Sequence, residues 1–350
     1  MKLYHFSGAG NNFVVLDGRG ADMAPFRVPE RIVALCAQYH TDGLMILCAG
    51  EAASNSGDAA SSLRAEEFCK TNLGSAEAPP RGPGRTARLQ NSSATPASGS
   101  GVVISSEVEK SPSSLHGLSV QSADFRMEFY NPDGSGGMMC GNGGRYIAAF
   151  ADYLGIRPGD GSRIFRFQAP DGPHTAELLA KDAKGWTIRL GMKDVSGVTP
   201  VLGGYFLDTG TRHYVRFVDD VEAIDIEKEG PRYRHDPAFA PIGANANFVQ
   251  RLPGGGIKVR TFEKGVEGET LACGTGITAS AIAAWFSAGE ISRQARNDKK
   301  DASLGRNDSV HTPVRARQDD LSVDFTPVGP DTFTAVYLTG PAVLLATYKI

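Results

Sequence analysis

Two short segments of the sequence repeat one pattern, and each carries a cysteine in the same place. The first reads MMCGNGGRYIAAFA around Cys140, and the second reads LACGTGITASAIAAW around Cys273. In both, Cys-Gly-x-Gly is followed at once by small and apolar residues, a pattern that predicts a buried helix. One such cysteine alone is best explained as an incidental residue at a helix start. Two matched copies predict a duplicated architecture with one site between its halves.

The position of each cysteine suggests a specific chemistry. A thiol acts as a base only as thiolate, and the N–H groups and dipole at a helix N-terminus lower its pKa. The neighbouring glycines let backbone N–H groups approach an anion such as a carboxylate. Suppose that one cysteine with its helix start lies on each side of a substrate α-carbon. One sulfur can then remove the α-proton, and the other can return a proton to the opposite face. Both helix ends also stabilise the charge that develops.

Composition and charge argue against several classes of protein. The chain has 350 residues, 41% hydrophobic and 21% charged, with a formal net charge of -3. This charge argues against a nucleic-acid surface or a basic membrane patch. We find no long apolar stretch, no signal peptide, no dinucleotide fingerprint and no Walker motif. We therefore expect a cytoplasmic enzyme of two domains that binds neither nucleic acid nor membrane.

The five cysteines do not form a disulfide framework or a zinc pattern, because they are scattered and odd in number. Cys36 and Cys48 lie in apolar segments and are expected to be small buried hydrophobes. Cys69 lies in a segment expected to be disordered. No metal is expected.

The chain divides into ordered and irregular stretches. A helix is predicted over 29–40 and a strand from Gly43. Residues 51–123 are rich in Ser, Ala, Gly and Pro, and we interpret them as a disordered insertion between two neighbouring strands, GLMILCA and DFRMEFYN. A polar stretch over about 289–311 is interpreted as a solvated loop after the second helix. Further strands are predicted by alternation and β-branched residues over 186–192, 205–218, 245–252, 256–263, 321–326 and 333–340.

Several segments of the sequence resemble one known family. They read GAGNNFVVLD, FYNPDGSGGMMCGNGGR, GANANFVQ, FEKGVEGETLACGTG and YLTGPA, in that order along the chain. Together they resemble the diaminopimelate epimerase family, which interconverts LL- and meso-diaminopimelate without pyridoxal phosphate in lysine and peptidoglycan precursor synthesis. The resemblance covers nearly all of the chain outside the two insertions.

The resemblance implies a fold and a set of partners. The fold is α+β, with two pseudo-symmetric lobes, each a curved, mostly antiparallel sheet wrapped around a central helix. The expected N-terminal lobe spans 1–192 and is completed by 339–350, and the C-terminal lobe spans 193–338. The resemblance also implies diaminopimelate as the small-molecule substrate, no cofactor, and a homodimer.

The resemblance further implies which residues form the site. Cys140 and Cys273 are the catalytic pair, and His213 has a supporting role. The substrate-binding residues implied are Asn11, Asn131, Gly141, Asn142, Thr211, Asn245, Glu263, Lys264, Gly274 and Thr275. Asn11 and Asn131 have another interpretation, because Asn in a turn often serves only the backbone, and Asn245 can simply end a loop before a strand. Glu263 can equally be an exposed strand charge.

Four features depart from the family pattern. Lys264 stands where the family usually has Arg, and Lys lacks the bidentate fork for a carboxylate. Thr211-Arg212-His213 stands where the family usually has Asn-Pro-His. Asn12 replaces the usual Asp, and Glu267 is an extra residue before Cys273. Neither insertion has a counterpart in the family.

Two competing interpretations remain. A proline or hydroxyproline racemase shares the two-thiol logic, but its first motif carries His where this chain has Asn142. A degenerate binding protein without catalysis would explain the insertions and the changes at Thr211 and Lys264. The persistence of both cysteines and both glycine pairs favours a catalyst.

Overall fold

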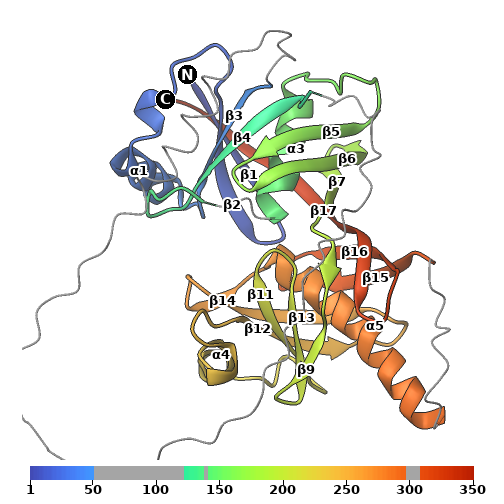
Figure 1. Cartoon of the computed structure of the whole chain (residues 1–350). Coiled ribbons are helices and arrows are strands. Elements are labelled where there is room, and N and C mark those ends of the chain that lie inside the picture. Colours follow the sequence, from blue (N-terminus) through green and yellow to red (C-terminus); the bar gives the residue numbers. More distant parts are fainter. Residues whose placement is uncertain (51–121, 138–140, 297–307) are drawn as a thin grey trace, which may run out of the picture. The chain divides into compact units, whose positions relative to one another are not determined.

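The computed structural model describes residues 1–50, 122–137, 141–296 and 308–350 (Figure 1). The described part is rich in strands, and its pairings join 17 strands into one continuous sheet. Most neighbouring strands are antiparallel, and the parallel pairs include β2 with β3 and β11 with β12. The predicted insertion over 51–123 lies almost entirely outside the described residues.

One group of strands surrounds the helix that begins inside the first Cys-Gly-x-Gly segment. This helix, α3 (Gly141–Tyr153), is almost entirely buried, and its Ile147 and Phe150 pack into a hydrophobic cluster with residues of the surrounding strands. The strands of this group are β1 (Lys2–Gly8), β2 (Asn11–Asp17), β3 (Leu44–Ala49), β4 (Phe125–Tyr130), β5 (Ile164–Ala169), β6 (Gly172–Asp182) and β7 (Gly185–Gly191). Helix α1 (Pro29–Tyr39), after the short 3-10 helix η1 (Ala24–Phe26), packs on β2 and β3.

A second group surrounds the helix that follows Cys273. Helix α5 (Gly274–Arg296) buries Ile277, Ala281 and Ile282 in a separate cluster. The helix can lie close to the strands because glycine, alanine and serine fill most of its buried positions. The elements of this group are β8 (Val195–Ser196), β9 (Thr199–Val201), β10 (Gly204–Asp208), β11 (Arg212–Phe217), α4 (Ile226–Arg234), η2 (Pro237–Phe239), β12 (Asn245–Arg251), β13 (Ile257–Glu263), β14 (Gly268–Thr270), β15 (Val310–Arg315) and β16 (Asp320–Pro327).

A single long strand connects the two groups. Strand β17 (Thr332–Lys349) pairs with β16 through its first half, with β7 in its middle and with β1 through its second half (Figure 1). Leu338, in the middle of β17, is fully buried. A strand shared in this way fixes the register of both groups through one continuous set of backbone hydrogen bonds.

Several predictions from the sequence are confirmed. The helix expected over 29–40 is α1, and the strand expected from Gly43 is β3. Strands β3 and β4 pair antiparallel from Leu44↔Tyr130 to Ala49↔Phe125, so the insertion does join neighbouring strands. The predicted strands over 186–192, 245–252, 256–263 and 321–326 correspond to β7, β12, β13 and β16, and 333–340 forms part of β17.

Two predictions are wrong in part. The segment 205–218 is a hairpin of two strands, β10 and β11, because Gly210 turns the chain with a φ of +107° that favours glycine. The stretch 289–311 is not irregular throughout, since α5 continues to Arg296 and β15 begins at Val310. Residues 297–307 lie outside the described part.

Helix α4 and strands β5 and β6 were not predicted. Helix α4 has only nine residues and contains Gly230 and Pro231, which resemble helix breakers. Its N-cap signal was nevertheless present, because the Asp225 side chain accepts a hydrogen bond from the N–H of Lys228.

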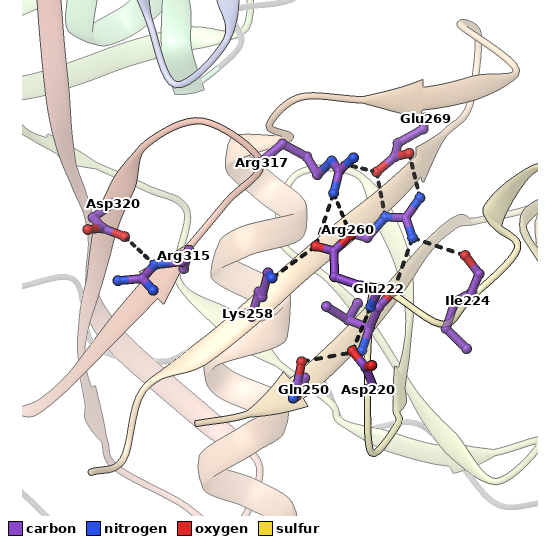
Figure 2. Close-up of polar contacts among 11 residues, drawn as sticks. Asp220, Glu222, Ile224, Gln250, Lys258, Arg260, Glu269, Arg315, Arg317 and Asp320 are labelled. Carbon is purple, nitrogen blue, oxygen red and sulfur yellow. Dashed lines mark hydrogen bonds and ion pairs between the residues drawn. The ribbon is translucent and has the colours of Figure 1, made fainter. Parts of the chain in front are cut away.

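An ionic network supports the strands that lead to Cys273 (Figure 2). Arg260 on β13 is only 8% exposed and donates two hydrogen bonds of 2.7 Å to Glu269 on β14. Its remaining nitrogen donates to the carbonyl oxygens of Val221 and Ile224 at 3.0 Å. The planar guanidinium thus joins β13, β14 and the loop before α4 through bidentate geometry.

A second arginine extends this network to another loop. Arg317 contacts Glu269 at 3.3 Å and Glu222 at 2.8 Å, and Lys258 contacts Glu222 at 2.9 Å (Figure 2). The backbone N–H of Arg317 also donates to the carbonyl of Leu271 at 3.3 Å. Two arginine side chains therefore hold Glu269, and a backbone hydrogen bond holds Leu271, in the segment that leads to Cys273.

Arg260→Met should lower the free energy of unfolding by on the order of 2 kcal/mol, because it leaves Glu269 and two carbonyls with fewer donors. The matched control is Arg315→Met, since Arg315 forms a solvent-exposed ion pair with Asp320 at 3.0 Å in the same region. That control should cost less than about 0.5 kcal/mol. Urea unfolding of the two variants measures the difference, and equal losses would contradict the structural role of Arg260.

Candidate functional site

The second cysteine stands at the start of a buried helix, as predicted. The carbonyl of Cys273 accepts the N–H of Ile277 at 2.8 Å, which makes Cys273 the N-cap residue of α5. The residue is 7% exposed, and its sulfur lies 3.4 Å from the hydroxyl of Thr275 in the first helical turn. The unpaired N–H groups of a helix start favour negative charge, and a thiolate is one such charge.

The start of α3 faces the start of α5. A Cβ placed on Gly141 would lie 3.4 Å from the Cα of Gly274, and one on Gly274 would lie 3.2 Å from the Cα of Gly141. Both would also meet Leu338 of β17, at 3.1 and 3.0 Å. The two helix starts therefore touch through the glycines that follow the two cysteines in sequence. Cys140 itself lies outside the described residues.

Asn142 links the two helix starts by hydrogen bonds. Its amide nitrogen donates to the side-chain oxygen of Asn11 and to the carbonyl of Ala272 at 3.3 Å, just before Cys273. Its oxygen accepts from the fully buried Arg145 at 2.9 Å. Because the amide is 3% exposed and bonded at both ends, its orientation is fixed.

The turn between β1 and β2 is fastened to the same place. The hydroxyl of Tyr146 on α3 donates to the carbonyl of Gly8 and lies 3.2 Å from that of Asn11. Gly10 has a φ of +91°, and a Cβ there would lie 2.3 Å from the Cβ of Leu271. Only glycine fits this turn, which brings Asn11 next to Asn142.

A polar cluster lies against the first turn of α5. The Nε2 atom of His213 is 3.0 Å from the hydroxyl of Thr275 and 2.9 Å from that of Thr211, and the two hydroxyls are 3.0 Å apart. His213 is fully buried, and burial lowers its pKa from 6.5 to about 3. The imidazole is therefore neutral at physiological pH.

Asn245 and Lys264 meet through the backbone. The side chain of Asn245 donates to the carbonyl of Arg212 at 3.1 Å and accepts the backbone N–H of Lys264 at 2.8 Å. Asn245 thus joins β11 to the end of β13, and both of its hydrogen bonds are to backbone groups. The side chain of Lys264 is exposed.

Glu263 is a half-buried carboxyl at the end of β13. Burial raises its pKa above the usual 4.5, and the charge of Asp42 raises it further, while a 2.9 Å hydrogen bond from Thr270 lowers it. The alternative of a solvated strand charge therefore does not describe this residue. Burial therefore disfavours the ionised form of this carboxyl relative to a carboxyl in water.

Asn131 is the predicted site residue with only local contacts in the structure. Its side chain donates to the hydroxyl of Ser135 at 3.0 Å, and its backbone N–H donates to the carbonyl of Ser135 at 2.9 Å. These bonds close a turn at the end of β4. The segment leads toward α3, but residues 138–140 lie outside the described part.

Several polar residues of the site were not predicted. Arg145 and Tyr146 on α3, Asp42 before β3, and Asn247 on β12 all bond to predicted site residues. Asn247 had a usable signal, because it follows Asn245 by two positions and so shares its face of the strand. The buried arginine had none, since a single Arg in a glycine-rich segment resembles a surface residue.

Two structural features are absent from the described residues. They contain no group of three His, Cys, Asp or Glu side chains that could hold a metal ion. No helix in the described ranges is long and apolar enough to cross a membrane. The described side chains at the two helix starts include the Cys273 thiol, the Thr275 hydroxyl, the Asn142 amide, the Arg145 guanidinium and the imidazole of His213.

Buried His213 should make folding stability depend on pH in a defined direction. As the pH falls below 6.5 the unfolded chain protonates this histidine, whereas the folded protein does not until about pH 3. The unfolded state binds more protons in this window, so stability falls with decreasing pH, by up to about 1.4 kcal/mol per pH unit. Urea unfolding at a series of pH values should show this slope reduced in His213→Gln. The exposed His235 provides the control, and His235→Gln should retain the slope.

Comparison of the sequence with known proteins identifies a family profile and relatives. The family profile described as "Diaminopimelate epimerase" matches residues 205–301. The diaminopimelate epimerase of Flavobacterium psychrophilum is 36% identical over 222 residues, which cover 63% of this chain and 77% of that protein. The diaminopimelate epimerase of Chlorobaculum tepidum is 39% identical over 167 residues, which cover 46% of this chain and 63% of that protein.

A solved structure shares the fold. The Bacillus anthracis phenazine biosynthesis protein of the PhzF family superposes with a TM-score of 0.56 and 10% identity, covering 100% of this chain and 98% of that chain. At that identity the likeness concerns the fold alone. The sequence matches show more than the fold. They establish that the chain belongs to the diaminopimelate epimerase family and is an isomerase.

Proposed function

We propose that this isomerase interconverts LL-diaminopimelate and meso-diaminopimelate, without a cofactor, by proton transfer between Cys140 and Cys273. The observation that carries the proposal is the contact of the two helix starts at Gly141 and Gly274. Since each glycine directly follows one cysteine in sequence, the chain enters both helices within a few residues of one point. The proposed metabolic place is lysine and peptidoglycan precursor synthesis.

The proposed reaction balances without an oxidant or reductant. The thiolate of one cysteine takes the α-proton, so the C–H electron pair stays on the α-carbon and spreads into its carboxylate. The thiol of the other cysteine then gives its proton to the opposite face of that carbon. The backbone N–H groups at the two helix starts stabilise the carboxylate as this charge develops. The two sulfurs exchange roles in the reverse direction.

The substrate contacts are part of the same proposal. We assign the α-carboxylate to the helix starts at Gly141, Asn142, Gly274 and Thr275, and the rest of the substrate to more distant side chains. Asn245 donates one amide hydrogen to Arg212, and we assign its second to substrate. The remaining assigned side chains are Asn11, Asn131, Thr211, Glu263 and Lys264.

The two charged residues would recognise the far end of the substrate. An ammonium group beside Glu263 would favour the ionised carboxylate and so return its raised pKa toward normal. The exposed Lys264 would meet the distal carboxylate as a point charge. Because Lys replaces the bidentate fork of Arg, we expect a weaker hold on that carboxylate.

We propose two lobes as the framework of this site. The N-terminal lobe would comprise 1–192 with 339–350, and the C-terminal lobe 193–338. Two observations support the division: the hydrophobic cluster around α3 is separate from that around α5, and Met192 packs against both. Leu338, at the proposed boundary in β17, is also the side chain that meets both Gly141 and Gly274.

The bonding of Asn142 bears on the racemase alternative. The Asn142 amide donates to the side-chain oxygen of Asn11 and accepts from the guanidinium of Arg145. A side chain at this position must therefore both donate and accept. A neutral imidazole offers the same two functions, but with different spacing. The described contacts favour the asparagine set, and therefore diaminopimelate, over a proline-type substrate.

Replacing either Cys140 or Cys273 by Ala should lower the turnover of LL-diaminopimelate by about a thousandfold, since each thiol serves one face of the carbon. The measurement follows the α-hydrogen into deuterated water by NMR, with LL-diaminopimelate and L-proline as parallel substrates.

The matched controls are Cys36→Ala and Cys48→Ala. Both of these thiols are buried in the structure, and burial raises their pKa. They should retain wild-type exchange. Exchange with proline alone would establish the racemase alternative, and exchange with neither substrate would favour a binding protein without catalysis.

Gly274→Ala should lower turnover by on the order of tenfold or more while leaving the fold intact. The added Cβ would lie 3.0 Å from Leu338 and 3.2 Å from the Cα of Gly141, so the two helix starts must separate by a few tenths of an ångström. In the control, Gly268→Ala, the added Cβ has no atom within 4 Å. Steady-state kinetics and thermal unfolding of both variants test this, and equal turnover would remove the helix contact from the mechanism.

A further inference from the structure

We propose that Asn247 is a positioning residue, which fixes the tautomer of His213 and thereby directs a chain of hydrogen bonds onto the sulfur of Cys273. The proposal concerns a residue outside the set assigned above. The interpretation of Cys273 as a catalytic base rests on the proposed function. The chain of hydrogen bonds does not rest on it.

Two neighbours decide the orientation of the Asn247 amide: one backbone carbonyl and one side-chain hydroxyl. The residue is fully buried on β12, with one end 3.0 Å from the carbonyl of Tyr214 and the other 2.9 Å from the hydroxyl of Thr261. A carbonyl oxygen can only accept, so the amide nitrogen faces Tyr214. The amide oxygen therefore faces Thr261 and accepts its hydroxyl hydrogen.

This orientation decides where His213 carries its proton. The amide nitrogen of Asn247 also lies 3.1 Å from Nδ1 of the imidazole. An amide nitrogen only donates, so Nδ1 must accept and must be unprotonated. Burial keeps the ring neutral, and the single ring hydrogen therefore sits on Nε2.

From Nε2 the donation continues toward the sulfur. The Nε2–H group faces the hydroxyls of Thr275 at 3.0 Å and Thr211 at 2.9 Å. When the Thr275 oxygen accepts from the ring or from Thr211, its own hydrogen is free to point at the sulfur of Cys273, 3.4 Å away. Each donor in the chain then points toward the sulfur, and donation to sulfur favours the thiolate.

The chain is packed against the helix without spare room. A Cβ on Gly276 would lie 2.4 Å from the amide oxygen of Asn247 and 3.2 Å from Cε1 of His213. The first turn of α5 thus rests directly on these two side chains. Their distances to Thr275 are fixed by the backbone as well as by hydrogen bonds.

Other charged groups on the neighbouring elements have their own partners. Arg145 on α3 donates to Asn142, Arg212 on β11 donates to the carbonyl of Phe239, and Glu263 on β13 accepts from Thr270. Lys264 is exposed. The hydrogen bonds through Asn247, His213 and Thr275 lead from the sheet to the Cys273 sulfur.

The first test reads the tautomer directly, in the full-length protein, by ¹⁵N NMR of histidine-labelled samples. Wild type should show His213 neutral with its proton on Nε2. Asn247→Asp keeps the shape but accepts at both ends, so the ring proton should move to Nδ1. Asn247→Leu removes the donor and should give a mixture of tautomers.

The second test measures the reactivity of the sulfur and needs no substrate. The rate of alkylation of Cys273 by iodoacetamide, followed by peptide mass spectrometry, reports its thiolate fraction as the pH is varied. Both Asn247 variants should react about tenfold more slowly at neutral pH, with the profile displaced to higher pH. Thermal unfolding is recorded in parallel. If the Leu variant does not fold, the near-isosteric Asp variant carries the test.

The matched control is Gln250→Leu, on the same strand. Gln250 accepts the backbone N–H of Val221 at 3.3 Å, in the ionic network rather than beside His213 (Figure 2). This control should change neither the tautomer nor the alkylation rate. A wild-type proton on Nδ1, or an Asp variant with unchanged alkylation, would overturn the proposal. Failure of the diaminopimelate assay with the expected NMR result would instead refute the proposed function alone.

Discussion

The contact between two helix starts is the constraint on which the rest of this structure depends. Gly141 and Gly274 approach so closely that neither can carry a Cβ without meeting the other or Leu338. Two buried helices can approach end to end only if their N-terminal N–H groups have an acceptor or an anion to face. The shared strand β17 and the ionic network around Arg260 hold the surrounding segments in the positions that this contact requires.

Buried asparagines give the site its definition. Asn142 joins the two helix starts, Asn245 joins β11 to the end of β13, and Asn247 joins β12 to the imidazole of His213. In each case the amide donates at one end and accepts at the other, so a rotated amide would leave buried groups unpaired. That penalty fixes a single arrangement, which an apolar core of the same volume would not do.

The sequence predicted the parts of the site that have a local signature. Helix starts after Cys-Gly-x-Gly, the strand pair that flanks the insertion, and the polarity of Asn142 were all readable from neighbouring residues. The role of Asn247 was not, because it depends on a tautomer that only the Tyr214 carbonyl and the Thr261 hydroxyl decide. The backbone role of Asn245 and the split of 205–218 into a hairpin likewise depend on partners distant in sequence or on one glycine dihedral angle.

The electrostatics of the site follow from burial of its titratable groups. Burial lowers the pKa of His213 and raises that of Glu263, so both residues move toward their uncharged forms. The start of α5 places fixed dipoles near the Cys273 sulfur: the N–H groups of its first turn and the hydroxyl of Thr275. Dipoles held by a packed backbone do not titrate, so a thiolate stabilised by them keeps its environment as the pH changes. At the thiols of Cys36 and Cys48, by contrast, burial is the largest influence and raises the pKa.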